Sequence, residues 1–298
     1  MRHIRQALSV TAYDYRMWKK NIRVIATFLL TFILCFLLTD KTVSLAQEHG
    51  TTMQMFESFI WTFGDSNSIL LISLLLVLLF SDMPFLSSAT PLYLVRIDRK
   101  SWAVGQLIYI ASATFLYMLF VLLSTMALSM KLSYPGNVWS ATAAILGYSG
   151  EGEMVLLPVL VKTLEMSHPY QCTAVIFLLM LLYALLLVSV MLLFNILRGQ
   201  QAGVISVFLF TVYGFVLSPA TISNILKLPD ELYYRANVIV GWVSPLNQAT
   251  YHMHDFGYDR LPTLNQTYLI FLALIVLLFA MTLLAIRRYS FNFTGTEG

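Results

Sequence analysis

Charged residues are scarce in this chain. They make up 11% of its 298 residues, against about a quarter in a typical soluble domain. Five stretches contain no Asp, Glu, Lys or Arg, and a sixth is interrupted only by Asp82. These stretches are 24–39, 66–85, 101–130, 172–197, 199–226 and 261–286. A water-soluble fold is close to excluded.

Other absences narrow the chemistry. The chain has no Gly-x-x-x-x-Gly-Lys-Ser/Thr phosphate loop, so it does not hydrolyse ATP by that route. Its apolar stretches offer no ionisable residue for coupling to an ion gradient, because Asp82 lies close to the end of its stretch. The only two cysteines, Cys35 and Cys172, lie in or beside apolar stretches. We interpret them as small buried side chains and not as a disulfide or metal pair.

What is present is a series of apolar segments, each close to the roughly 20 residues that a helix needs to cross a bilayer. Membrane strands would alternate apolar and polar residues, which these segments do not. We therefore predict an all-α integral membrane protein, a single domain over 1–298 with six transmembrane helices. The predicted spans are 22–40, 67–85, 103–129, 172–196, 202–223 and 264–286. We expect the first to be retained, since its 23-residue leader is longer than that of a signal peptide.

Lys and Arg predict the orientation. Twelve of the eighteen lie in the N-terminal leader, the second and fourth connections and the tail, whereas eleven of the fifteen acidic residues lie in the other connections. Both termini should therefore be cytoplasmic (N-in, C-in), which an even number of spans satisfies.

The leader shows helical periodicity. Ile4, Leu8, Ala12, Tyr15, Trp18 and Ile22 recur at spacings of three and four, and most of the cations lie elsewhere. One interpretation is an amphipathic helix in the membrane interface, with Tyr15 and Trp18 at headgroup depth and Arg16, Lys19 and Lys20 toward anionic lipid. The alternative is an ordinary basic segment beside the membrane.

The second connection, 82–102, predicts a short helix. Thr90 can cap it and Pro91 suits its first position. An apolar and aromatic front follows, and the charges gather at the end, which favours docking on a soluble partner. A simple cationic topology loop is the alternative.

Enzyme and metal sites are weakly indicated. The run His252-Met253-His254-Asp255 has no further ligands at a recognisable spacing, so we interpret it as a solvated outer loop. The motifs of intramembrane metalloproteases and of serine hydrolases are missing. Gly199 and Gly203 are better placed for a turn than for a dimer seam.

The whole pattern resembles the type-2 ATP-binding-cassette (ABC) exporter permeases that lack a fused ATPase. Four stretches carry the resemblance: the leader YDYRMWKKNI at 13–22, RIDRKSW at 96–102, RGQQ at 198–201 and SPLN at 244–247. The long outer connection 131–171 departs from the family pattern and leaves the outer vestibule undefined.

The resemblance implies roles for three groups of residues. The segment 91–100 would be a cytoplasmic coupling helix that docks on the ATPase, through Pro91, Leu92, Tyr93, Arg96, Asp98, Arg99 and Lys100. Tyr15, Arg16, Trp18, Lys19 and Lys20 would belong to the interfacial helix, and Trp242, Pro245 and Leu246 to an outer re-entrant segment.

On this basis we expect a transport subunit of a bacterial cytoplasmic membrane, not an enzyme, that exports an amphipathic or lipophilic cargo such as a drug, peptide or lipid. Its expected partners are an ABC ATPase subunit, which would bind the ATP and Mg²⁺, a second permease chain and membrane lipid. The chain itself would hold no cofactor or metal, and no nucleic acid is expected. The alternative is a membrane sensor or assembly factor that binds peptide or lipid without transporting it.

Overall fold

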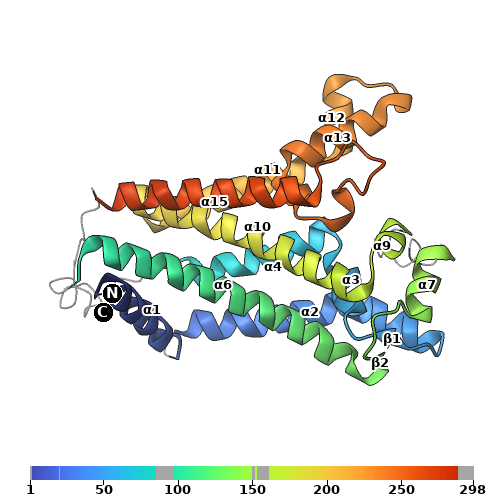
Figure 1. The fold of residues 1–298 in the computed structure, drawn as a ribbon, viewed down its shortest axis with the longest axis horizontal. Helices are drawn as coiled ribbons and strands as arrows, with labels where there is room; N and C mark the ends of the chain where they lie inside the picture. The colour runs from blue at the N-terminus through green and yellow to red at the C-terminus, as the bar shows by residue number, and fades with distance from the viewer. Residues whose placement is uncertain (1, 20, 85–96, 150–151, 153–160, 288–298) are drawn as a thin grey trace.

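The protein is a bundle of long helices with smaller helices gathered at one end (Figure 1). The computed structural model describes residues 2–19, 21–84, 97–149, 152 and 161–287. Its long helices are α1 (Arg2–Trp18), α2 (Ile22–Glu48), α4 (Ser66–Phe80), α6 (Arg99–Ser129), α10 (Pro169–Arg198), α11 (Gln200–Val216) and α15 (Leu264–Ile286). The shorter ones are α3 (Glu57–Phe63), α7 (Ala141–Tyr148), α9 (Val161–Met166), α12 (Pro219–Leu226), α13 (Tyr233–Val243) and α14 (Pro245–Gln248).

Short 3-10 turns and one pair of strands complete the described fold. The turns are η1 (Met130–Leu132), η2 (Asp230–Leu232) and η3 (Tyr251–Met253). The strands β1 (Met53–Gln54) and β2 (Ser133–Tyr134) are parallel, with Met53 opposite Ser133. They join the connection after α2 to the one after α6.

Helices long and apolar enough to cross a membrane confirm the prediction of an all-α membrane protein. Four of the described helices, α2, α6, α10 and α15, meet that criterion unbroken. Two more spans arise if the bent pairs α3 with α4 and α11 with α12 each count as one; their bends are 90° and 72°. The structure thus gives four to six candidate spans where the sequence predicted six.

Local sequence explains both bends. Gly64 follows α3, and the Asp65 carboxylate accepts hydrogen bonds from the N–H groups of Asn67 and Ser68 to begin α4. At the second bend the Ser218 hydroxyl accepts from the Thr221 N–H, and Pro219 occupies the first position of α12, where its missing N–H costs nothing.

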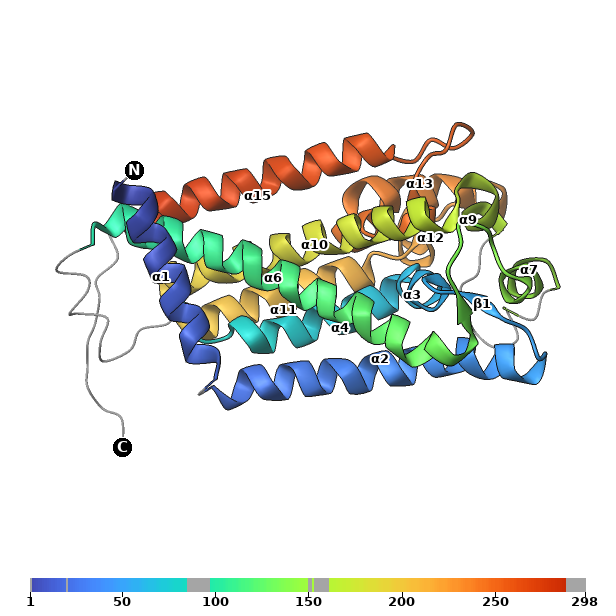
Figure 2. The same cartoon turned by 60° about the horizontal axis from the view of Figure 1, so that its bottom comes forward.

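Helix α10 forms the centre of the bundle. It packs against α3, α4, α6, α11 and α15, and most of its surface is buried by them (Figures 1 and 2). By contrast, α2 and α15 lie at the sides and expose apolar side chains such as Ile25, Phe36, Leu269 and Val276. Exposed apolar side chains on long helices are the expected surface of a protein whose solvent is lipid.

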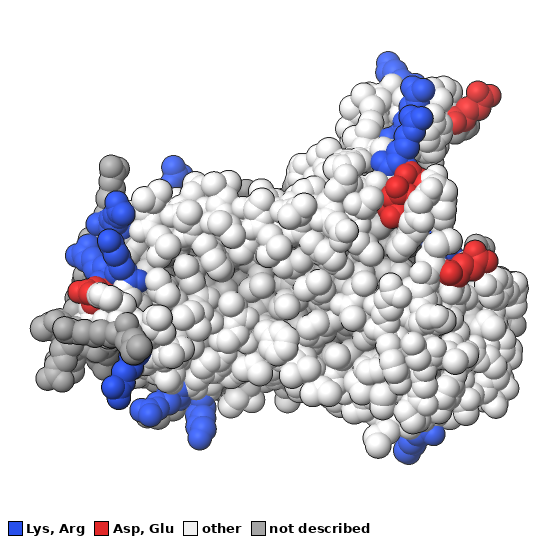
Figure 3. Space-filling model, viewed as in Figure 1, with Lys and Arg blue, Asp and Glu red and all other residues white. Residues whose placement is uncertain are grey.

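The two ends of the bundle differ in charge. Helix α1 and the end of α15 lie at one end, and α7, α9, α12 and α13 lie at the other (Figure 2). Lys and Arg side chains gather at the α1 end, the visible acidic side chains lie mostly at the opposite end, and an uncharged band separates them (Figure 3). We call these the cationic end and the outer end.

Candidate docking site at the cationic end

The segment between α4 and α6 was predicted to dock a partner, and both of its flanks are described. Pro91, Leu92, Tyr93 and Arg96 lie outside the described residues, as does Lys20. The site is therefore built from the flanks, residues 81–84 and 97–101, and from the helix ends that hold them.

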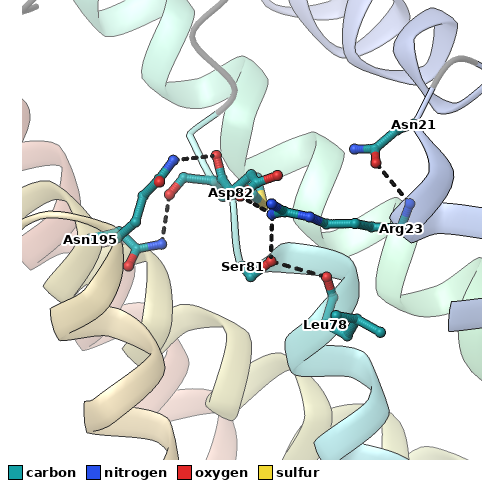
Figure 4. A network of polar contacts seen from close by, with 8 residues as sticks. Asn21, Arg23, Leu78, Ser81, Asp82 and Asn195 are labelled. Carbon is teal, nitrogen blue, oxygen red and sulfur yellow. Dashed lines mark hydrogen bonds and ion pairs between the residues drawn. The ribbon is translucent and has the colours of Figure 1, made fainter. Parts of the chain in front are cut away.

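An ion pair fixes the first flank to the start of α2. The guanidinium of Arg23 pairs with the carboxylate of Asp82, and it also donates to the Ser81 hydroxyl at 3.3 Å (Figure 4). Asn21 positions Arg23 by accepting its backbone N–H at 3.0 Å as the cap of α2. Asp82 thus lies just after α4, near the end of its span as the sequence indicated, and the fold supplies a cationic partner.

The junction of α10 and α11 holds the same flank from the other side. The Asn195 amide donates to the Met83 carbonyl at 2.6 Å, and the Gln200 amide donates to the Asp82 carbonyl at 3.3 Å (Figure 4). Gly199, with φ of +95°, makes the turn between the two helices, which only glycine adopts without strain.

Asn195 fits here because Gly203 has no side chain. A Cβ added at Gly203 would lie 1.8 Å from the Asn195 Oδ1 and 2.7 Å from the Met191 carbonyl oxygen. The two glycines of the stretch 198–203, RGQQAG, therefore make a turn and a close helix contact, in keeping with the turn interpretation.

The second flank is fixed to the start of α1. The His3 imidazole lies 3.4 Å from the Asp98 carboxylate and within hydrogen-bonding distance, 3.1 Å, of the Ser101 hydroxyl. Asp98 is extended and precedes α6, and Arg99 and Lys100 form the first turn of α6. These three residues thus begin the third span, which corrects the prediction that they end a separate short helix.

A cavity of 650 Å³ opens beside this flank, between the starts of α1 and α6. It is lined by His3, Ile4, Asp98, Arg99, Lys100, Ser101 and Val104. Cationic and apolar side chains thus share one recess next to the predicted docking segment.

Helix α1 packs along α6 through a row of polar contacts. Thr11 donates to the Gly105 carbonyl at 2.9 Å, Tyr15 donates to the Ser112 hydroxyl at 2.8 Å, and the Trp18 indole donates to the Tyr109 hydroxyl at 2.6 Å. Gly105 permits this approach, since a Cβ there would lie 2.8 Å from both the Ala7 carbonyl oxygen and the Val10 Cβ.

Asp14 is buried in the same contact. Its carboxyl accepts one hydrogen bond, from the Gln106 amide at 2.8 Å. Burial raises the pKa of Asp14 from 3.8 to about 7, and the Gln106 bond offsets only part of that shift. The group is therefore largely protonated in the folded protein at slightly acidic pH.

The leader is thus an amphipathic helix, but its faces are assigned differently from the sequence interpretation. Ile4 and Leu8 are 66% and 52% exposed, so they are free to face lipid, whereas Tyr15 and Trp18 turn toward α6. The helix ends at Trp18, so Lys19 lies just beyond it. Arg16 lies in its last turn and is exposed.

At the outer end, the predicted re-entrant residues lie at a helix break. Trp242 is in α13, Pro245 begins α14, and the Ser244 hydroxyl caps α14 and donates to the Gly214 carbonyl of α11 at 3.2 Å. Leu246 is buried against Gly214, whereas Trp242 is 42% exposed. The segment therefore folds back against the fifth candidate span.

The histidine run is not the solvated loop that we expected. His254 is fully buried, and its ring lies 3.1 Å from the Tyr251 carbonyl and 3.0 Å from the Thr267 hydroxyl of α15. Burial lowers the pKa of both His252 and His254 to about 4, so both are neutral. In the described part of the chain, no group of three or more His, Cys, Asp or Glu is arranged to hold a metal. Cys35 and Cys172 are both buried, as predicted.

Sequence reasoning missed the roles of Asn195 and Asp14. A polar Asn and a charged Asp on otherwise apolar helix faces were available signals, since such groups are buried only with partners. No family model, curated protein or solved structure that was compared with this chain matches it.

Proposed function

We propose that this chain is the permease subunit of an ATP-driven ABC exporter of the type-2 kind, energised by a separate ATPase subunit. The ATPase would dock on segment 82–100 at the cationic end, which would face the cytoplasm. A second permease chain, identical or similar, would complete the transporter in a bacterial cytoplasmic membrane.

The observation that carries the proposal is the anchoring of both flanks of that segment. Its first flank is bonded to α2, α10 and α11, and its second flank is bonded to α1 and continues into α6. A displacement of the segment by a bound partner would therefore be transmitted directly to five helices, α1, α2, α6, α10 and α11. Such an arrangement suits a part that passes a conformational change from a soluble subunit into the membrane.

The cargo proposal rests on one face of the bundle. Helix α4 packs against α2 on one side and α11 on the other, so candidate spans one, two and five form a continuous face. Away from the helix ends, its exposed side chains are apolar or aromatic, among them Phe32, Leu71, Phe208 and Phe215. A pathway between two such faces would suit an amphipathic or lipophilic cargo, and the spans supply no charge to bind an ion.

Purification of the full-length chain in mild detergent from its native membranes tests the proposal. We expect mass spectrometry to find a phosphate-loop ATPase in the complex. The double substitution Tyr93→Ala, Arg96→Ala should reduce its recovery at least tenfold, because it removes an aromatic anchor and a cation from the predicted interface. Arg235→Ala at the outer end is the matched control and should leave recovery unchanged.

Recovery of the chain with membrane proteins alone, from cells that express such ATPases, would contradict the proposal. It would favour a sensor or assembly factor instead. Equal loss of the ATPase in the Arg235→Ala control would show that the docking segment has been assigned wrongly.

A further inference from the structure

A second cavity, of 590 Å³, lies at the outer end where three elements meet. Helix α9, helix α13 and the loop from η3 to α15 enclose it. Its lining includes Lys162 of α9, Tyr234 of α13, His252 of η3, and Tyr258, Asp259 and Arg260 of the loop. Gly241 allows the loop to approach α13, since a Cβ there would lie 2.6 Å from Leu261. The cavity is large enough for a small ligand or a headgroup.

The cation of this cavity's lining on α9, Lys162, already has bonding partners. Lys162 pairs with Asp259 and donates to the His254 carbonyl at 2.8 Å, and its ammonium lies 5.3 Å from the ring centres of both Phe256 and Tyr258. His252 is neutral, as described above. These groups hold the loop in place and leave little positive charge for a ligand.

The side of the cavity near Tyr258 is acidic. Desolvation raises the pKa of the Tyr258 hydroxyl, and the negative charges of Asp259, Glu165 and Asp255 raise it further. The Asp255 carboxylate is itself occupied, because it accepts the N–H groups of Gly257 at 2.7 Å and Asp259 at 2.9 Å. An anion would avoid this side.

The side of the cavity near Tyr234 has the opposite character. The Arg235 guanidinium donates to the Tyr234 hydroxyl at 3.2 Å, and the positive charge of Arg260 also acts on that hydroxyl; together they lower its pKa. Arg260 is exposed, and its carbonyl accepts the Trp242 indole N–H at 3.1 Å, which holds its backbone against α13. Among the described residues, neither arginine forms an ion pair with a carboxylate.

We propose that Arg235, Arg260 and the Tyr234 hydroxyl form a binding site for the anionic headgroup of an amphiphile. Guanidinium groups bind carboxylate and phosphate oxygens through paired hydrogen bonds. Here Arg235 is bonded to the Tyr234 hydroxyl, and Arg260 lines the same cavity as Tyr234. The apolar part of the ligand would lie along Ile239 and Trp242, which are 37% and 42% exposed. The acidic side near Tyr258 sets the orientation, with the headgroup on the Tyr234 side.

The headgroup could belong to a membrane lipid or to a single-chain cargo that is leaving the transporter. The second case rests on the proposed function, whereas binding itself needs only this chain. The site is tested by native mass spectrometry of the full-length chain, released from maltoside micelles and titrated with octyl phosphate, with octyl glucoside or with dioctanoyl phosphatidylglycerol. Octyl glucoside has the same tail as octyl phosphate but no charge.

We expect octyl phosphate to bind at least tenfold more tightly than octyl glucoside. Arg260→Gln and Arg235→Gln should each weaken octyl phosphate binding about tenfold, the loss expected for one charge-assisted contact. Lys227→Gln removes a cation from the connection between α12 and α13, outside the cavity lining, and should change nothing. Tighter binding of phosphatidylglycerol that depends on Arg260 would assign the site to lipid, and binding of octyl phosphate alone would assign it to a single-chain acid.

Equal binding of the charged and uncharged octyl ligands would overturn the inference, as would an equal effect of Lys227→Gln. Because no ATPase is present, these outcomes do not depend on the docking proposal. Failure to recover an ATPase in the earlier experiment would leave the anion site standing.

Discussion

Two buried polar side chains at the cationic end, Asp14 and Asn195, each use one polar atom and leave another without a partner among the described residues. A buried oxygen without a hydrogen bond destabilises a fold unless something compensates. For Asp14 the compensation is a proton, since a neutral carboxyl costs far less to bury than a carboxylate. For Asn195 it is the short bond to the Met83 carbonyl, which ties α10 to the end of α4.

Asp14 should make stability depend on pH. Its pKa is about 7 when folded and about 3.9 when unfolded, so the folded protein holds an extra proton between these values. The contribution of Asp14 to the free energy of unfolding is at most about 4 kcal/mol. It is fully present below about pH 4 and is lost as the pH rises through about 7. We expect the thermal midpoint in detergent to fall from pH 5 to pH 8, and the Asp14→Asn variant to lose most of that dependence. A variant with the slope of the unaltered protein would contradict the assignment.

Gly203 and Asn195 should be coupled. Gly203→Ala places a Cβ against the Asn195 side chain, so we expect a loss of about 1–3 kcal/mol. Asn195→Ala alone should cost a similar amount, because it removes the donor to the Met83 carbonyl. The double variant should lose less unfolding free energy than the two single variants lose together, since removing the Asn side chain makes room for the methyl group.

The recovery should be partial, because the Met191 carbonyl still crowds position 203. The coupling is measured as a double-mutant cycle. The unfolding free energies of the unaltered protein, the two single variants and the double variant are determined in the same detergent. Strict additivity would show that the two residues do not meet across the α10 and α11 contact.

At the scale of elements, the α1 and α6 contact depends on Gly105. A larger side chain there would meet the backbone of α1, so Gly105→Leu should push α1 away from α6. A cysteine in place of Ala7, which is 1% exposed, reports the change by its reaction with a maleimide. Cys35 and Cys172 are first replaced by alanine. We expect slow labelling with Gly105 present and labelling at least tenfold faster in the Gly105→Leu variant; equal rates would contradict the packing.

Most helices could be predicted from the sequence because the bilayer imposes their length and composition. The sixth predicted span, 264–286, coincides with α15, and the third and fourth lie within α6 and α10. The first was predicted to stop at Asp40, yet α2 continues to Glu48, because a helix can extend beyond the hydrocarbon without losing its backbone hydrogen bonds.

The contacts of the candidate site were beyond such reasoning. Apolar content places Asn195 in a span, but only the fold shows that it reaches residue 83, far away in the chain. In the same way, helical periodicity predicted that the leader is a helix but could not show that Tyr15 and Trp18 bond to α6. His254 seemed solvated because its partner Thr267 begins another helix. In each of these cases the environment of the side chain is set by a contact with a residue from another element, which the sequence does not show.

At the scale of the whole molecule, charge separation gives the bundle a direction. Lys and Arg lie mainly at the end that holds α1, and lipid-facing helices separate it from the more acidic outer end. The positive-inside rule then predicts that the cationic end faces the cytoplasm. Only this orientation lets a cytoplasmic ATPase reach segment 82–100, and it puts the cavity near Tyr234 on the outer side, where it could receive outer-leaflet lipid or departing cargo.

Labelling of intact cells tests that orientation. Val138 is 68% exposed at the outer end, and Gln201 is exposed at the start of α11 near the cationic end. In the background without native cysteines, we expect a membrane-impermeant maleimide to label the Val138→Cys variant in intact cells and the Gln201→Cys variant only after the membrane is opened. The reverse result would place segment 82–100 outside the cell. No cytoplasmic ATPase could then dock on it, so this one measurement can reject the transport proposal without purifying any complex.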